Sequence, residues 1–473
     1  MKKLLLLTSF LFTLTFYAQN NSNFYLAPNG VTCLCPGADF GDTGTLTING
    51  ETKTFTKRSR AQLNALIDND EQDPQIALTC TSGIENMYNM FIFHSLFNQT
   101  LNNWDVSSVT NMEAMFYGAD SFNQPLDNWD VSNVTDMGSM FRGASDFNQP
   151  LDNWDVSQVN DMISMFNRAT AFNQDLNSWD VSNITDMERM FVIASSFNQP
   201  LNNWDVSSVT NMEAMFYGAD SFNQNINNWD VSNVTGMGAM FYRATSFNQP
   251  LNSWDVSQVN DMISMFNRAT AFNQPLNNWD VSRITNMTNM FVIASSFDQP
   301  LNNWDVSNVT GMGRMFQGTS SFNQPLDNWD VSNVTDMESM FNSASSFNQD
   351  ISRWCVQQIP YEPFEFALNS ALQEDFFPNW GSECNLSTTN PEAIGFNILI
   401  YPNPSNSKVF IENDRQIILS KIKLIDMLGR DIKTLSASQI THGLDVSGVD
   451  AGNYFVQFTT VDNQQFVKRL VVN

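Results

Sequence analysis

Residues 126–150 read LDNWDVSNVTDMGSMFRGASDFNQP, and this stretch recurs almost unchanged from about residue 101 to residue 350. A fixed period in the range of about 20–50 residues is typical of repeat architectures, in which each unit buries its apolar face against its neighbours. The sequence therefore predicts a solenoid of about eleven 25-residue turns over residues 79–354. Its tryptophans mark the period: Trp104, Trp129, Trp154, Trp179, Trp204, Trp229, Trp254, Trp279, Trp304, Trp329 and Trp354.

One repeat combines two apolar periods. Trp129 and Val131 alternate with polar residues, which is the pattern of a half-buried strand. The apolar residues from Val134 to Ala144 then follow helical spacing, with Thr135 placed as an N-cap. We therefore expect an α/β solenoid with one short parallel strand and one short helix per turn. In four repeats a glutamate would complete a capping box: Thr110/Glu113, Thr185/Glu188, Thr210/Glu213 and Thr335/Glu338.

A longer period lies over the 25-residue one. Residues 101–124 and 201–224 are identical, and residues 156–174 recur as residues 256–274. A block of four repeats has therefore been duplicated whole. An array whose length changes in this way favours a role in reach or display over a unique catalytic geometry.

The motif WDVSNVTDM, followed by MF and FNQP, resembles the BspA-like leucine-rich-repeat surface proteins of bacteria over about residues 79–354. The resemblance implies a right-handed α/β solenoid on a cell surface, often linked to adhesion. The sequence departs from ordinary leucine-rich repeats in having Trp where Leu is usual, and in lacking a single invariant Asn at the strand exit.

Both ends of the array carry segments of a different kind. Residues 1–18 have the charged start and apolar run of a signal peptide. Residues 19–78 read as an N-terminal cap, with a hairpin around Asn49-Gly50 and a short helix opened by a Ser59/Gln62 capping box. Residues 355–384 read as a C-terminal cap and residues 385–396 as a polar linker.

Residues 397–473 form a separate domain with the short alternating strands of a small all-β sandwich. The segments YPNP (401–404), LGR (428–430), LDVS (444–447) and AGNY (451–454), with the final VKRLVVN, resemble the C-terminal sorting domain of the type IX secretion system. This resemblance implies contact with that secretion machinery, export across the outer membrane, removal of the domain at the surface, and a Gram-negative source of the Bacteroidetes type. The matching residues include Pro402, Asn403, Pro404, Gly429, Asp445, Gly452, Tyr454 and Lys468.

Composition limits the function. The 473 residues carry 22 basic and 49 acidic side chains, a net charge of −27, which argues against nucleic acid or an anionic membrane as partner. Beyond the leader, no segment is apolar enough to span a membrane. With His94 and His442 as its only histidines, the chain offers no nucleophilic triad and no histidine-rich metal site, and we expect no enzyme and no cofactor.

Three functional classes remain after this exclusion. The first is an adhesion or binding module for an extracellular protein or glycan, which would use the positions that vary between repeats, such as Tyr117, Arg142, Asn167 and Val192. The second is a structural spacer or surface-layer component. The third is a secreted polysaccharide-active enzyme with a carboxylate pair in the caps.

The cysteines predict staples at both ends of the array. The position of Asp130 holds Cys80 in the first turn and Cys355 in the last. We expect Cys355 to pair with Cys384, because an oxidising periplasm permits disulfides. Cys80 is expected to pair with either Cys33 or Cys35, which leaves one odd thiol.

An acidic ladder occupies one outward position of the predicted strands. Like charges stacked about 4.8 Å apart repel one another, so they need compensation. Three answers are open: hydrogen bonds within each turn, Ca²⁺ bridging adjacent rungs, or protonation of some rungs. The ladder consists of Asp105, Asp130, Asp155, Asp180, Asp205, Asp230, Asp255, Asp280, Asp305 and Asp330.

Overall fold

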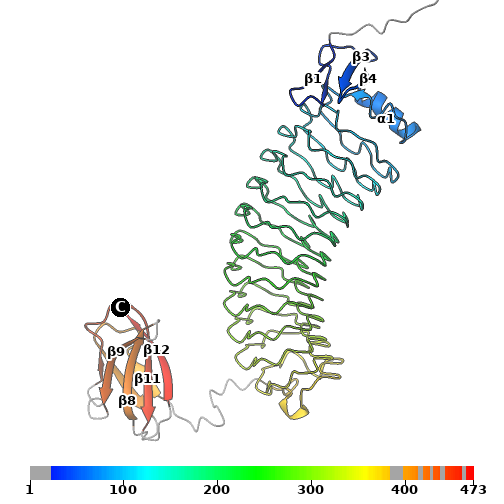
Figure 1. Cartoon of the computed structure of the whole chain (residues 1–473). Coiled ribbons are helices and arrows are strands. Elements are labelled where there is room, and N and C mark those ends of the chain that lie inside the picture. The colour runs from blue at the N-terminus through cyan, green and yellow to red at the C-terminus, as the bar shows by residue number, and fades with distance from the viewer. Residues whose placement is uncertain (1–22, 384–397, 414–418, 427–429, 437–442, 461–464) are drawn as a thin grey trace, which may run out of the picture. The chain divides into compact units, whose positions relative to one another are not determined.

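The protein is described by a computed structural model that covers residues 23–383, 398–413, 419–426, 430–436, 443–460 and 465–473 (Figure 1). The chain divides into two compact units, residues 1–384 and 385–473, and each is treated by itself. The signal peptide expected at residues 1–18 and the linker expected at residues 385–396 lie outside the described residues.

The first unit begins with short strands. β1 (Tyr25–Leu26) pairs antiparallel with β2 (Cys33–Leu34). β3 (Thr43–Ile48) and β4 (Glu51–Lys57) form the predicted hairpin, and β5 (Thr79–Cys80) adds to β4 in parallel. The turn between β3 and β4 needs two residues with positive φ, which Asn49 (51°) and Gly50 (83°) supply.

A single α-helix, α1 (Arg60–Asn69), follows the hairpin. The Ser59 side chain accepts from the Gln62 backbone N–H, and the Gln62 side chain accepts from the Ser59 N–H, so the predicted capping box is confirmed. Leu63 and Ile67 of α1 are buried in the same core as the first repeats. The helix therefore covers one end of the repeat core.

The repeats stack as successive 25-residue coils, each made of turns (Figure 1). Backbone N–H groups alternate between two kinds of partner. Met137, Ser139 and Phe141 donate to carbonyls of the next coil at 2.8–2.9 Å. Between them, Met140 and Arg142 donate back three residues within their own coil, at 3.1 and 3.0 Å. Each coil is thus closed by its own turns and bonded to its neighbour by the remaining N–H groups.

The α/β solenoid with one helix per turn is wrong. Apart from α1 and the three-residue 3-10 turn η1 (Glu374–Phe376), the described residues form strands, isolated bridges, turns and loops. Ser139 and Gly143 have φ of 54° and 74°, which a right-handed helix does not allow. The predicted N-cap is also wrong, because the Thr135 hydroxyl donates to the Thr110 carbonyl of the preceding coil at 3.1 Å.

The strand predicted around the tryptophan is wrong as well. The Trp129 N–H closes a turn on the Leu126 carbonyl at 3.1 Å. Parallel pairing occurs instead as isolated bridges further along the coil, seven residues after the tryptophan, for example between Asp136 and Asp161. The inward and outward directions were predicted correctly for Trp129, Val131 and Asp130, since the first two are buried and Asp130 is exposed. Asp105, which was also predicted to face outward, is buried.

Aromatic side chains fill the core in continuous rows. Trp129 and Trp154 stack with ring centroids 6.4 Å apart, and Phe141 lies 4.0 Å from Phe147 and 5.8 Å from Phe166 in the next coil. The indole N–H of every coil tryptophan from Trp104 to Trp354 donates to the carbonyl 28 residues earlier. The tryptophan therefore joins adjacent coils by packing and by a hydrogen bond.

A second row of bonds runs through the return loop of each coil. The Asn148 side-chain oxygen accepts from the Asn173 backbone N–H and from the Gln174 side-chain amide, both at 2.9 Å. This asparagine row continues from Asn98 to Asn348, and Asp298 takes the same acceptor role in one coil. The Asn-Gln pair of the repeat is thus an inter-coil fastener.

The second unit contains two antiparallel sheets. One has the order β10-β7-β6, from β6 (Ile398–Tyr401), β7 (Lys408–Asn413) and β10 (Leu444–Asp445). The other has the order β12-β11-β8-β9, from β8 (Leu419–Asp426), β9 (Asp431–Ser436), β11 (Gly452–Thr460) and β12 (Gln465–Val472). Both sheets contribute to one core, for example Val409 from the first and Val456 from the second.

Candidate binding surface

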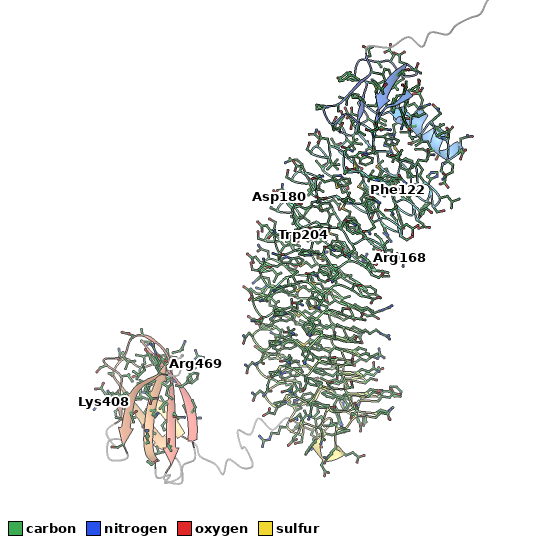
Figure 2. All side chains as sticks on the ribbon, viewed as in Figure 1. Phe122, Arg168, Asp180, Trp204, Lys408 and Arg469 are labelled. Carbon is green, nitrogen blue, oxygen red and sulfur yellow. A yellow bond between two sulfur atoms is a disulfide. The ribbon has the colours of Figure 1, made fainter. Side chains whose placement is uncertain are left out.

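Two adjacent positions of each coil, those of Arg142 and Gly143, change from coil to coil. Most of their side chains reach the surface, but Asn167, which was predicted to lie there, is buried, as are Asn267 and Val292. Arg168, which occupies the position of Gly143 in the next coil, and Asp180 of the acidic ladder lie at opposite edges of the stack of coils in Figure 2. We call these positions the variable stripe. Its members are Ile92/Phe93, Tyr117/Gly118, Arg142/Gly143, Asn167/Arg168, Val192/Ile193, Tyr217/Gly218, Tyr242/Arg243, Asn267/Arg268, Val292/Ile293 and Gln317/Gly318.

The backbone of the stripe is costly for most side chains. The second stripe position has positive φ in every coil, including 62° at Arg168, 55° at Arg243 and 60° at Arg268. A non-glycine residue in this region costs about 1–2 kcal/mol. Glycine occupies the equivalent position in four coils, among them Gly118 and Gly143. Arginine therefore stands where the fold itself would favour glycine, which indicates a use for its side chain at the surface.

The stripe carries positive charge, whereas the net charge of the whole chain is negative. Residues 79–354 contain no lysine and eight arginines, four of which lie on the stripe. Two of the others are paired, with Arg189 3.0 Å from Glu188 and Arg314 2.7 Å from Glu338. Within the described part of the chain, no acidic side chain lies within 4.0 Å of the guanidinium groups on the stripe: Arg142, Arg168, Arg243 and Arg268.

Aromatic rings accompany these arginines. The Arg142 guanidinium lies 4.9 Å over the Tyr117 ring, and Tyr117 lies 4.9 Å from Phe93, whose side chain is 67% exposed. Further along, Tyr217 and Tyr242 stack in parallel at 4.4 Å. The pKa of the Tyr217 hydroxyl is raised, chiefly by burial and then by Tyr242. The stripe thus offers fixed aromatic groups together with hydrogen-bond donors.

The structure shows which groups compensate the repulsion between the aspartates of the acidic ladder. In all ten rungs the backbone N–H two residues on donates to the aspartate carboxylate. The Ser207 hydroxyl adds a bond of 2.6 Å to Asp205, and these serine bonds lower the pKa of the Asp205 carboxyl. The geometry supports compensation within each turn. Among the described residues, no three or more His, Cys, Asp or Glu side chains are grouped so that they could hold a metal ion.

A second acidic row, which the sequence analysis missed, lies on the same coils. It runs through the bridge positions, including Asp136 and Asp161, with Glu113 beside them. The pKa of Glu113 is raised by burial and by these two aspartates. Because Asn or Gly replaces Asp in several coils of this row, such as Asn111 and Gly236, its periodicity is hard to recognise in the sequence.

The cysteines close the N-terminal end. Cys35 and Cys80 form a disulfide, which selects one of the two predicted pairings. Cys33 is a buried free thiol whose pKa is raised to about 12 by burial and by Asp105. Cys355 is disulfide-bonded, and Cys384, its predicted partner, lies outside the described residues.

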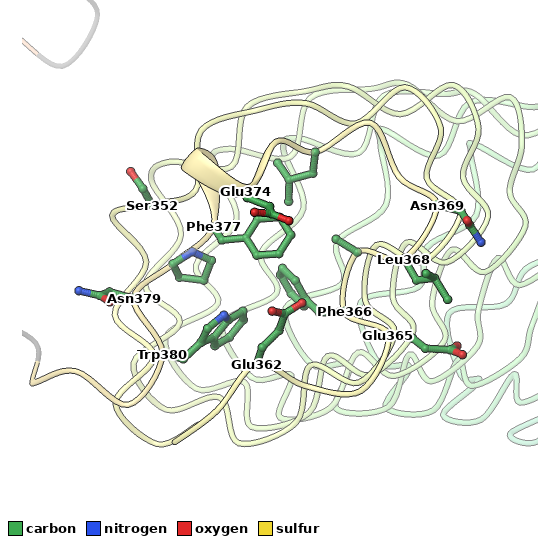
Figure 3. A pocket seen from close by; sticks show the side chains of 13 residues that line it. Ser352, Glu362, Glu365, Phe366, Leu368, Asn369, Glu374, Phe377, Asn379 and Trp380 are labelled. Atoms are coloured by element: carbon green, nitrogen blue, oxygen red, sulfur yellow. The ribbon is translucent and has the colours of Figure 1, made fainter.

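The C-terminal end has a cavity of about 990 Å³ (Figure 3). Trp380 and Phe377 meet Phe366 edge-to-face at 4.9 and 5.6 Å, so these rings close the aromatic core. Glu362 and Glu374 also line the cavity and are exposed. Glutamates and aromatic rings of the cap therefore line one cavity.

In the second unit, the predicted sorting residues fasten the chain end. Asn403 donates to the Arg469 carbonyl and accepts from the Val471 N–H, both at 2.8 Å. The peptide bonds before Pro402 and Pro404 are cis. Asp445 accepts from the Ser447 N–H and hydroxyl, and the Tyr454 hydroxyl donates to the Asp450 carbonyl. Gly452 begins β11, Lys468 is exposed on β12, and Gly429 lies outside the described residues.

The coils define a repeat protein and the second unit a secretion domain, and comparisons assign both. The chain belongs to the DUF285 family, described as Mycoplasma protein of unknown function, which matches residues 62–179, 126–211, 164–279 and 260–380. Residues 399–473 match the secretion system C-terminal sorting domain. Comparison with curated proteins and with solved structures gives no match.

The sorting domain supports secretion or cell-surface localisation and implies the type IX secretion machinery as a partner. No helix among the described residues is long and apolar enough to cross a membrane. The family match supports the repeat resemblance, while the leucine-rich-repeat identity stays a prediction.

Proposed function

We propose that the chain is an exported surface module that binds an extracellular protein or glycan through its variable stripe and catalyses no reaction. The observation that carries the proposal is the placement of arginines with positive φ on this stripe. A spacer would have no use for side chains that cost stability at the surface. The coils would then serve as a rigid support that presents the stripe.

Binding can be tested with the exported protein on arrays of glycans and matrix proteins. We expect a reproducible set of ligands for the native protein. Binding should fall about tenfold or more in a variant that replaces Arg142, Arg168, Arg243 and Arg268 by alanine. Absence of binding on all arrays would favour the spacer. A bound polysaccharide that is recovered shortened would favour the enzyme.

Export is a separate part of the proposal. We infer that residues 397–473 direct the chain to the type IX machinery and are removed at the surface, as the sorting domain suggests. Intact-mass analysis of surface protein from the native cell should show a chain without this segment. Retention of Asn473 on surface material would contradict removal. An Asn403→Ala variant, which loses both bonds to the last strand, should accumulate inside the cell.

A further inference from the structure

The variable stripe contains a hollow of about 640 Å³ near its N-terminal end. We propose that this hollow binds an acidic sugar residue of an extracellular glycan, with the carboxylate or sulfate held by Arg142 and Arg168. The inference rests on the proposed binding function and specifies the site and the class of its ligand. The volume of the hollow lies in the range usual for small-ligand sites.

Gly143 leaves the floor of the hollow open. Along the stripe, Gly118 and Gly143 are the one place where glycine occupies the second position in adjacent coils. A Cβ built on Gly143 would meet nothing closer than the Gly118 backbone at 3.5 Å, so the floor is open. The other stripe glycines are covered by the preceding coil: Phe93 lies 2.7 Å from such a Cβ on Gly118, and Ile193 lies 3.2 Å from one on Gly218.

The walls of the hollow carry complementary chemistry. Phe93 and Tyr117 form an aromatic side, against which the apolar face of a sugar can pack. Arg142 and Arg168 stand in successive coils, so their guanidinium groups can bind the two oxygens of one anionic group or two neighbouring groups. Asp120 also lines the hollow, exposed and able to accept from a sugar hydroxyl.

A glycan fits this site better than an acidic peptide. The stripe N–H groups are already used between coils, as in Gly143 to Asn167 at 2.7 Å and Arg168 to Val192 at 2.6 Å. A peptide strand would therefore find no free backbone ladder to join. Recognition must come from side chains, and guanidinium groups beside aromatic rings suit an anionic ring-shaped ligand.

The duplicated block provides matched controls. Arg168 and Arg268 occupy identical local sequences with φ of 62° and 60°, and both are exposed. In the coil that precedes Arg268 the stripe residues are Tyr242/Arg243, whereas in the coil that precedes Arg168 they are Arg142/Gly143. Replacing either arginine by alanine changes the coil equally, but only one change affects the hollow.

The experiment measures binding of the exported protein to immobilised polygalacturonate, dextran sulfate and neutral dextran. We expect binding to at least one of the two anionic polymers, weakening with salt, and none to dextran. The first polymer tests a carboxylate and the second a sulfate. Arg168→Ala should weaken binding about tenfold or more, whereas Arg268→Ala, which removes a stripe arginine outside the hollow, should weaken it much less.

Equal losses in the two variants, or binding to neither anionic polymer, would overturn the inference. If a matrix protein is bound while both polymers are not, the inference fails and the proposed function survives. If nothing is bound on any array, both fail. Tyr117→Ala and Tyr217→Ala, which lie in identical sequences, repeat the comparison for the aromatic wall, and Tyr117→Ala should weaken binding more than Tyr217→Ala.

Discussion

Two rows of the same coils follow opposite rules. The acidic ladder holds aspartate in ten consecutive coils, and each carboxylate accepts from its own turn. The second position of the variable stripe holds Gly, Arg, Ile or Phe, with positive φ throughout. The constant row satisfies a need of the coil, whereas the stripe keeps residues that the coil does not favour. Constancy within this chain therefore reports on folding, and variation reports on surface chemistry.

The prediction with the largest expected effect compares a constant aromatic residue with a variable one. Trp204 is buried, stacks on Trp229 and donates to the Leu176 carbonyl at 2.9 Å. Trp204→Ala should lower the free energy of unfolding by about 3–5 kcal/mol, as expected for a large core side chain. Tyr217→Ala should cost about 1 kcal/mol or less, because Tyr217 is only partly buried. Urea midpoints of the full-length variants measure both losses of stability. Similar losses in the two variants would contradict the distinction between constant core residues and variable surface residues.

The features of the fold that depend on local sequence were predicted correctly. The period, the inward side of Trp129, the Asn49-Gly50 hairpin and the Ser59/Gln62 capping box are all confirmed. The helix is wrong because overlapping turns, such as those closed by Met140 on Met137 and by Arg142 on Ser139, bury Met137 and Met140 much as a helix would. Nothing in the type of residue at Ser139 signals its positive φ, since bonds to the next coil impose it.

The candidate site was only partly predictable. The sequence pointed to Tyr117 and Arg142 as variable surface positions, but Arg168 was missed because a helix would have turned it away from them. The hollow depends on Gly118 and Gly143 lying side by side. The 25-residue period already predicted that these two positions lie in adjacent turns, but it did not predict the open space beside Gly143.

The asparagine row gives the next largest effect. Asn248→Leu removes the acceptor of the Asn273 N–H and the Gln274 amide, which should cost about 1–3 kcal/mol. Asn248→Asp should be nearly neutral, because Asp298 already fills this role in another coil. Thermal unfolding of the two variants checks the difference. A strongly destabilised Asn248→Asp would show that the amide group, rather than the acceptor oxygen, is required.

The ladder predicts a pH dependence. Since its serine bonds lower the folded-state pKa of Asp205, the carboxylate stabilises the fold above its unfolded pKa of about 4. This contribution is lost as the pH falls through the folded pKa. Asp205→Ala should therefore destabilise the protein at pH 7 and less so near pH 3, and Ser207→Ala should reproduce part of the effect. Urea titrations at both pH values measure this, and a difference that grows towards acid would contradict it.

The second acidic row should respond in the opposite direction, with the smallest effect. Burial, Asp136 and Asp161 raise the folded-state pKa of Glu113, so the fold favours its neutral form. That stability is present below the unfolded pKa and is lost as the pH rises through the folded pKa. Glu113→Gln should therefore raise the urea midpoint slightly at pH 7 and leave it unchanged in acid. The duplicated Glu213 also lies 3.7 Å from Arg189, so Glu213→Gln should gain less. If Glu113→Gln destabilises the protein at pH 7, this row is compensated like the ladder, and the two rows do not differ in kind.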